Sequence, residues 1–93
     1  MATVTGVATV DFGSTPVDEK DFVLADAGFA SQANAEAYFM AESTVDNDID
    51  AHEMAGSLIK VVCEPPGAGT MAVRCNVLAG LVTGTFKLRY VAT

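Results

Sequence analysis

The sequence predicts an all-β protein, an antiparallel β-sandwich of about six to seven strands, in a single domain over residues 1–93. Two observations support this prediction. Short segments in which apolar and polar residues alternate recur along the chain, and turns rich in glycine or proline separate them. A domain of 93 residues buries only a modest share of its surface, so we expect self-association to add stability.

The alternation is clearest near the two ends of the chain. Val4, Ala8 and Val10 share one face of the first segment, and Phe86 and Leu88 share one face of the last. In residues 33–40, alanine and glutamate favour a helix while the aromatic residues favour a strand, and we predict a strand. The predicted strands are residues 3–12, 22–25, 33–40, 57–63, 70–77 and 85–92.

The segment D-N-D-I-D-A-H-E, residues 46–53, concentrates the residue types used in metal and acid–base sites. We expect Ser43 or Asp46 to cap a short helical turn near residues 47–55 that ends by Gly56. Our main interpretation is a solvated connecting loop or an interface segment. Its binding or interface candidates are Asp46, Asp48, Asp50 and His52.

A calcium loop is the first alternative for this segment, because its three aspartates match the first three ligand positions of an EF-hand. The match then fails, since Ala51 stands where the sharp turn needs glycine and Ser57 stands where a bidentate glutamate is required. One histidine and two separated cysteines do not have zinc-ligand spacing either. We therefore predict no metal and no cofactor.

A small hydrolase is the second alternative. Asp50 and His52 are two residues apart and would share a face of an extended chain, where the carboxylate orients the imidazole. No serine lies in a nucleophile-elbow context, however, and the sequence identifies no catalytic residue. We predict that the protein is not an enzyme.

The net charge of −7, from 12 acidic and 5 basic residues, excludes nucleic acid and anionic membranes as favoured partners. No apolar run is long enough to span a membrane. Most acidic residues lie between Asp11 and Glu53, whereas Arg74, Lys87 and Arg89 come later. We expect these three basic residues to pair with the acidic half of a neighbouring subunit.

The two cysteines flank the turn P-P-G-A-G, residues 65–69. A hairpin centred near Gly67 places Met71, and not Cys75, opposite Cys63. The sequence thus predicts two buried free thiols.

Several segments resemble small virion structural proteins of tailed bacteriophages. They are G-V-A-T-V-D-F-G (6–13), E-A-Y-F-M (36–40), D-x-D-A-H (48–52), G-T (69–70) and L-V-T-G-T-F-K-L-R-Y-V (81–91). The resemblance spans most of the chain and implies a β-sandwich built into a head, tail or fibre. It implies self-association, with a homotrimer expected, contacts with capsid or fibre proteins, and a location in the virion after assembly in the host cytoplasm.

The order of strands is also distantly similar to H-type lectin domains, which are trimeric six-stranded sandwiches that bind sugars. This similarity implies an alternative function, a glycan-binding module at a fibre tip with residues 42–56 as the ligand surface. The chain departs from that pattern because it has no tryptophan and its last strand keeps only Phe86 and Tyr90 as aromatic residues.

Overall fold

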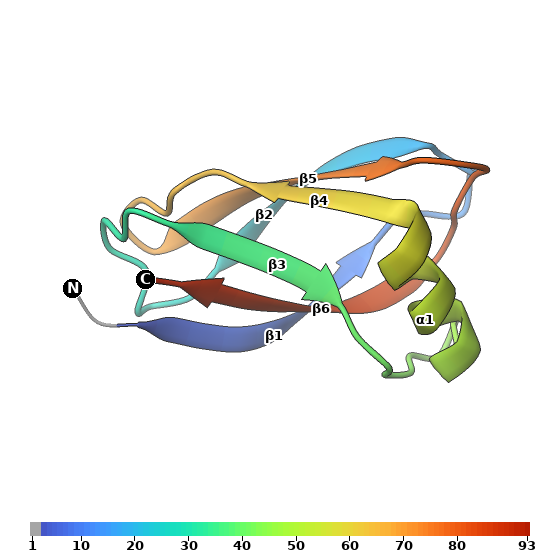
Figure 1. Ribbon diagram of the computed structural model, residues 1–93, viewed down its shortest axis with the longest axis horizontal. Helices are drawn as coiled ribbons and strands as arrows, with labels where there is room; N and C mark the ends of the chain where they lie inside the picture. Colours follow the sequence, from blue (N-terminus) through green and yellow to red (C-terminus); the bar gives the residue numbers. More distant parts are fainter. Residues whose placement is uncertain (1–2) are drawn as a thin grey trace.

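Six strands form two three-stranded sheets that pack together, in a computed structural model that describes residues 3–93 (Figure 1). The predicted antiparallel β-sandwich is confirmed. One sheet has the order β1-β6-β3 and the other β2-β5-β4, and all neighbouring strands are antiparallel. The elements are β1 (Val4–Asp11), β2 (Glu19–Ala25), β3 (Ala35–Phe39), α1 (Ile49–Leu58), β4 (Ile59–Cys63), β5 (Thr70–Val77) and β6 (Thr85–Ala92).

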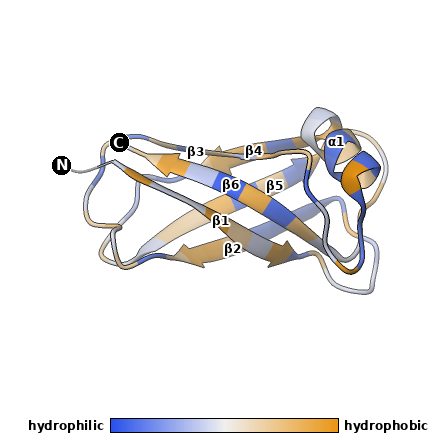
Figure 2. Cartoon of the chain, turned by 90° about the horizontal axis from the view of Figure 1, so that it is seen from below, coloured by the Kyte–Doolittle hydropathy of each residue, from blue (hydrophilic) through white to orange (hydrophobic). Residues whose placement is uncertain are grey.

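The core lies between the sheets and is built from the alternate residues of each strand. Hydrophobic and hydrophilic bands alternate along β6 (Figure 2), whose even-numbered residues are all buried. Within this core, the ring of Phe12 lies 5.2 Å from that of Phe22 and 5.7 Å from that of Phe86, both edge to face. The contact of Phe12 with Phe22 on β2 joins the two sheets, and aromatic side chains bury large apolar areas.

The strand over residues 33–40 is confirmed as β3, with Ala37 and Phe39 buried and Glu36 and Tyr38 exposed, as the alternation predicts. The second strand is longer than predicted. It begins at Glu19, not residue 22, because three charged residues that carry no apolar pattern pair with β5. Here pairing with a neighbouring strand outweighs local propensity.

The predicted start and end of the helical turn are both wrong. Asp48, and not Ser43 or Asp46, is the N-cap, and its side chain accepts a hydrogen bond from the Ala51 N–H at 2.9 Å. The helix then continues past Gly56 to Leu58, so Ser57 belongs to it and not to the next strand. Its buried face supplies the physical reason, because packing against the sandwich extends a helix whose last turn has weak intrinsic propensity.

The cysteines are free, as predicted, but only Cys75 is buried; Cys63 is half-buried. Val73, and not Met71, lies opposite Cys63 in the β4–β5 hairpin. Burial raises the pKa of Cys75 to about 12, and burial followed by the nearby Glu36 raises that of Cys63. Both thiols are therefore protonated and poorly nucleophilic at neutral pH.

At the end of the sandwich away from α1, Tyr90 donates a hydrogen bond to Asp26 Oδ2 at 2.5 Å. The tyrosine ring packs against Phe29, with ring centroids 5.3 Å apart, and over Gly6 on the neighbouring strand. A Cβ at position 6 would lie 2.3 Å from the Tyr90 hydroxyl oxygen, so this position requires glycine. The Tyr90–Asp26 hydrogen bond thus holds the β2–β3 connection against the β1-β6-β3 sheet.

Candidate functional site

The segment of residues 40–52 lies beside β6 at the point where β3 ends. The last pair of β3 and β6 joins Phe39 to Leu88. Thr93 exchanges hydrogen bonds with Asn34 on the β3 side of β6, so the odd-numbered residues of β6 direct their backbone groups to that side. Thr85 and Lys87 therefore face a position where β3 no longer runs.

Side chains of the segment take the place of the missing strand at Thr85. Asp46 Oδ2 accepts hydrogen bonds from the Thr85 N–H at 3.0 Å and from its hydroxyl at 2.9 Å. Thr44 Oγ1 and Asn47 Nδ2 each donate to the Thr85 carbonyl at 2.8 Å. Both backbone groups of Thr85 are thereby satisfied by side chains, as a paired strand would satisfy them with backbone.

His52 accepts the hydrogen bond of the Lys87 backbone N–H, which also faces the missing strand. Its ring is fully buried, with 0% of its surface exposed, and packs 5.0 Å from the ring of Phe86. Nε2 lies 2.9 Å from the Lys87 nitrogen, and Nδ1 lies 2.9 Å from the Asp48 carbonyl oxygen. Because a backbone N–H can only donate, Nε2 must accept and Nδ1 must carry the proton. His52 therefore joins α1 to β6 as a neutral imidazole.

These contacts correct the interpretation of residues 46–53 as a solvated loop. Asp46 binds the sheet, Asp48 caps the helix and His52 is buried between the two. Asp50 stays exposed in the first turn of the helix, where its negative charge interacts favourably with the helix dipole. The helix also separates Asp50 from His52, because residues two apart do not share a helix face. The hypothetical acid–imidazole pair is thus not formed.

The aspartates do not converge on one point, as an EF-hand would require. Within residues 3–93, no group of three or more His, Cys, Asp or Glu side chains is placed to hold a metal ion. Asp46 and Asp48 direct oxygens to backbone N–H groups of different elements, Thr85 and Ala51. The sequence match to a calcium loop reflects helix capping and sheet capping, which use the same carboxylate chemistry.

The three basic candidates do not come together either. Arg74 lies on the outer face of the β2-β5-β4 sheet, whereas Lys87 and Arg89 lie on the outer face of the other sheet. Arg74 forms a two-pronged ion pair with Asp21 of its own chain, with Nε to Oδ1 at 2.9 Å and Nη2 to Oδ2 at 3.3 Å. Arg89 donates from Nε to the sulfur of Met40. Of the three, Lys87 and Arg89 keep charges that no carboxylate of the described residues pairs with.

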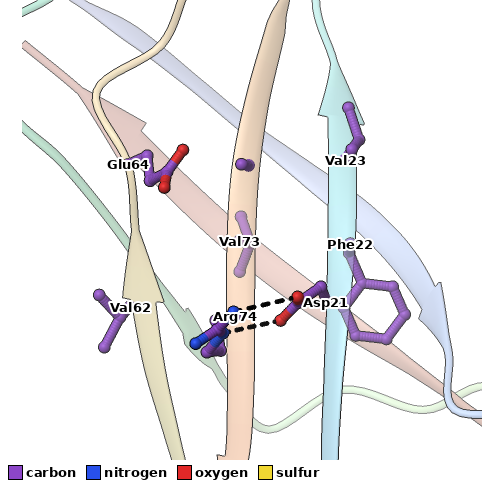
Figure 3. A pocket seen from close by; sticks show the side chains of 8 residues that line it. Asp21, Phe22, Val23, Val62, Glu64, Val73 and Arg74 are labelled. Atoms are coloured by element: carbon purple, nitrogen blue, oxygen red, sulfur yellow. Dashed lines mark hydrogen bonds and ion pairs between the residues drawn. The ribbon is translucent and has the colours of Figure 1, made fainter.

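Around the Arg74–Asp21 pair, the outer face of β2-β5-β4 is hollowed into a shallow, open depression (Figure 3). Val23 on β2 and Val62 on β4 border it, with 71% and 52% of their surface exposed. Glu64 adds a second carboxylate at the rim. The depression thus combines exposed aliphatic side chains with one arginine held in a defined orientation.

The prediction from sequence missed this face. No role was predicted for Val23 or Val62, because they lie in the runs F-V-L-A and K-V-V-C, where adjacent hydrophobic residues hide the alternation of a strand. The available signal was strand alternation, since Leu24 is buried and its neighbour Val23 must then point to the opposite side.

Comparison of the chain with models of known protein families, with curated protein sequences and with solved structures gave no match. Over residues 3–93, none of the helical structure has the length and apolar character needed to cross a membrane.

Proposed function

We propose that this chain is a non-enzymatic structural protein of a tailed-phage virion that works as an oligomer and packs against capsid or fibre proteins. The observation that supports this proposal is the exposed aliphatic face around the Arg74–Asp21 pair on β2-β5-β4. The resemblance of the sequence to phage structural proteins supplies the biological setting.

Burial of that face in a subunit contact is favourable for two reasons. Val23 and Val62 lose water contact, and aliphatic surface of this kind contributes about 25 cal/mol for each Å² removed from water. The arginine would enter the contact already neutralised by Asp21, so no unpaired charge is buried. In the free chain, with both side chains more than half exposed at 63% and 61%, the same ion pair adds little stability.

The opposite face of the sandwich offers a different surface. On the outer face of β1-β6-β3, Val7 and Tyr38 lie on either side of Arg89 in one row across the sheet. Arginine and tyrosine are enriched in interface cores. Two unlike faces allow head-to-tail contacts between copies, which close into a ring such as the expected trimer or stack into a longer assembly.

The first experiment measures the molar mass of the purified protein by light scattering on a sizing column, with EDTA and again with calcium. We expect a stable oligomer that is indifferent to both. Double substitution Val23→Asp and Val62→Asp is expected to reduce the mass, whereas Val45→Asp, at a residue that is 97% exposed on the loop before α1, is the matched control. A wild-type monomer at all concentrations contradicts the proposed function.

The virion location has its own test. Phage particles purified by density gradient from a lysate that expresses the chain are expected to contain it, in a fixed ratio to the major capsid protein by quantitative mass spectrometry. Its loss from the particles during the gradient contradicts the proposal.

A further inference from the structure

The β1 strand is an unprotected sheet edge. Each sheet has two edge strands, and natural proteins usually protect such edges by keeping them short, charged or covered. The edges formed by β3 and β4 are five residues long and lie side by side (Figure 1). The β2 edge is protected by charge. It carries Glu19 and Asp21, and Lys20 lies on the same side of the strand as the buried Leu24.

Among residues 3–93, none of these devices protects β1. It is eight residues long, V-T-G-V-A-T-V-D, and pairs with β6 in an unbroken register that has no bulge. It contains no proline, lysine or arginine, and its one charge, Asp11, is at its last position. In a sheet, such a strand is a template for a further strand.

The direction of the backbone N–H and C=O groups defines which residues of β1 can pair with a further strand. The Phe12 N–H donates to the Gly84 carbonyl, so the even-numbered residues of β1 bond to β6. The odd-numbered residues, Thr5, Val7 and Thr9, direct their N–H and C=O groups away from the sheet. Their side chains lie on its exposed outer face.

We propose that β1 pairs antiparallel with β1 of a second copy of this chain, so that the two β1-β6-β3 sheets join into one continuous sheet. The inference rests on the proposed self-association and adds to the two face contacts a separate, two-fold contact that joins copies in pairs. A register that places Val7 opposite Val7 also sets Thr5 opposite Thr9 and Asp11 opposite Thr3. No like charges meet, and β-branched residues face each other across the strands, which is a favourable cross-strand pairing.

Between the two possible orientations of a second copy, charge favours the antiparallel one. β1 runs toward the end of the sandwich that carries α1, where Asp46, Asp48, Asp50 and Glu53 make the chain strongly acidic (Figure 1). Antiparallel pairing directs the acidic ends of the two copies to opposite extremes of the dimer. Two chains of net charge −7 thereby meet at their neutral edge with their repulsive ends farthest apart.

A proline at position 7 tests this pairing, because the Val7 N–H points outward and its loss leaves the hydrogen bonds to β6 intact. The matched control is Val7→Thr, which keeps the N–H. In the dimer, Val7→Pro removes the two bonds of the central pair, and we expect the dissociation constant to rise about thirty-fold by sedimentation equilibrium. Val7→Lys, which keeps every backbone N–H but places like charges opposite each other, is expected to weaken the dimer as well.

Hydrogen exchange followed by NMR and cysteine crosslinking give independent readouts. The amides of Thr5, Val7 and Thr9 are expected to be protected at high concentration and to exchange rapidly on dilution. Oxidation of Val7→Cys is expected to yield a covalent dimer, and Ala25→Cys, on the edge strand of the other sheet, is not.

The outcomes separate this inference from the proposed function. An oligomer that Val7→Pro and Val7→Lys leave unchanged, or whose β1 amides exchange freely, overturns β1 pairing and leaves the oligomeric function standing. A monomeric wild-type chain overturns both.

Discussion

Replacing His52 by phenylalanine tests whether the segment of residues 40–52 really substitutes for a strand. Phenylalanine preserves a ring of similar size against Phe86 but removes both nitrogens. The Lys87 N–H, on a half-buried residue, then loses its acceptor, which is a fully buried ring. A buried donor left without a partner costs about 1–3 kcal/mol, whereas the Asp48 carbonyl still accepts the backbone N–H of residue 52.

We therefore expect the free energy of unfolding to fall by about 2 kcal/mol, which lowers Tm by roughly 10 °C in a domain of this size. Urea unfolding followed by circular dichroism measures the change, and native-state hydrogen exchange should show the Lys87 amide losing protection while that of Leu88 keeps it. Glu53→Gln, at the exposed neighbouring position on α1, is the control. Equal stability of His52→Phe and wild type would refute the reasoning that this bond matters.

Three further predictions concern the polar contacts at the two ends of the sandwich. Gly6→Ala drives a methyl group into the Tyr90 ring and should cost about 1–3 kcal/mol in urea unfolding, whereas Gly67→Ala, which meets open space, should change little; equal effects would argue against the clash. Asp48→Ala removes the helix N-cap and should cost about 1 kcal/mol, with reduced helical circular dichroism; an unchanged signal would contradict the capping role. The Tyr90 hydrogen bond, followed by that of the Gly28 N–H, lowers the pKa of Asp26, so its contribution to stability is present above the usual carboxyl pKa and is lost as pH falls through the lowered value. Burial and then Asp26 raise the pKa of Tyr90 to about 12, so the stability that the protonated Tyr90 hydroxyl contributes is complete below pH 10 and is lost as pH rises through about 12. Tyr90→Phe should therefore reduce the pH dependence of the free energy of unfolding in both the acid and the alkaline range.

The residue types of the candidate site were visible in the sequence, but their roles were not. The sequence shows that Asp46, Asp48 and His52 are close along the chain, and acceptors so arranged suit metal ions, helix caps and strand ends equally well. Which of these applies depends on Thr85 and Lys87, more than 30 residues away, as the bonds from Asp46 and His52 show. Local spacing carries no information about such a partner.

The relative positions of Arg74, Lys87 and Arg89 could not be predicted from the sequence for a related reason, and their pairing with a neighbouring subunit stays a prediction. Alternation placed all three on the outer faces of their strands, which is correct, although only Arg74 is exposed and the other two are half-buried. It could not say that β5 and β6 belong to different sheets, so that their outer faces point in opposite directions.

The sequence by itself determined the fold class, the approximate strands, the buried faces of β5 and β6, and the free cysteines, because strand alternation and turn residues are local properties of the chain. Tertiary structure alone decided the length of β2, the extent of α1, the burial of His52 and the exposure of β1. Each depends on which distant segment supplies the hydrogen-bond partner or the packed surface. Pairing with β5 extends β2, the Lys87 N–H on β6 needs the His52 ring as its acceptor, and β3 ends at Phe39 opposite Leu88, so that side chains must bond Lys87 and Thr85. Backbone groups must be paired wherever they are buried, and the chain satisfies that requirement with whatever residue the fold brings near.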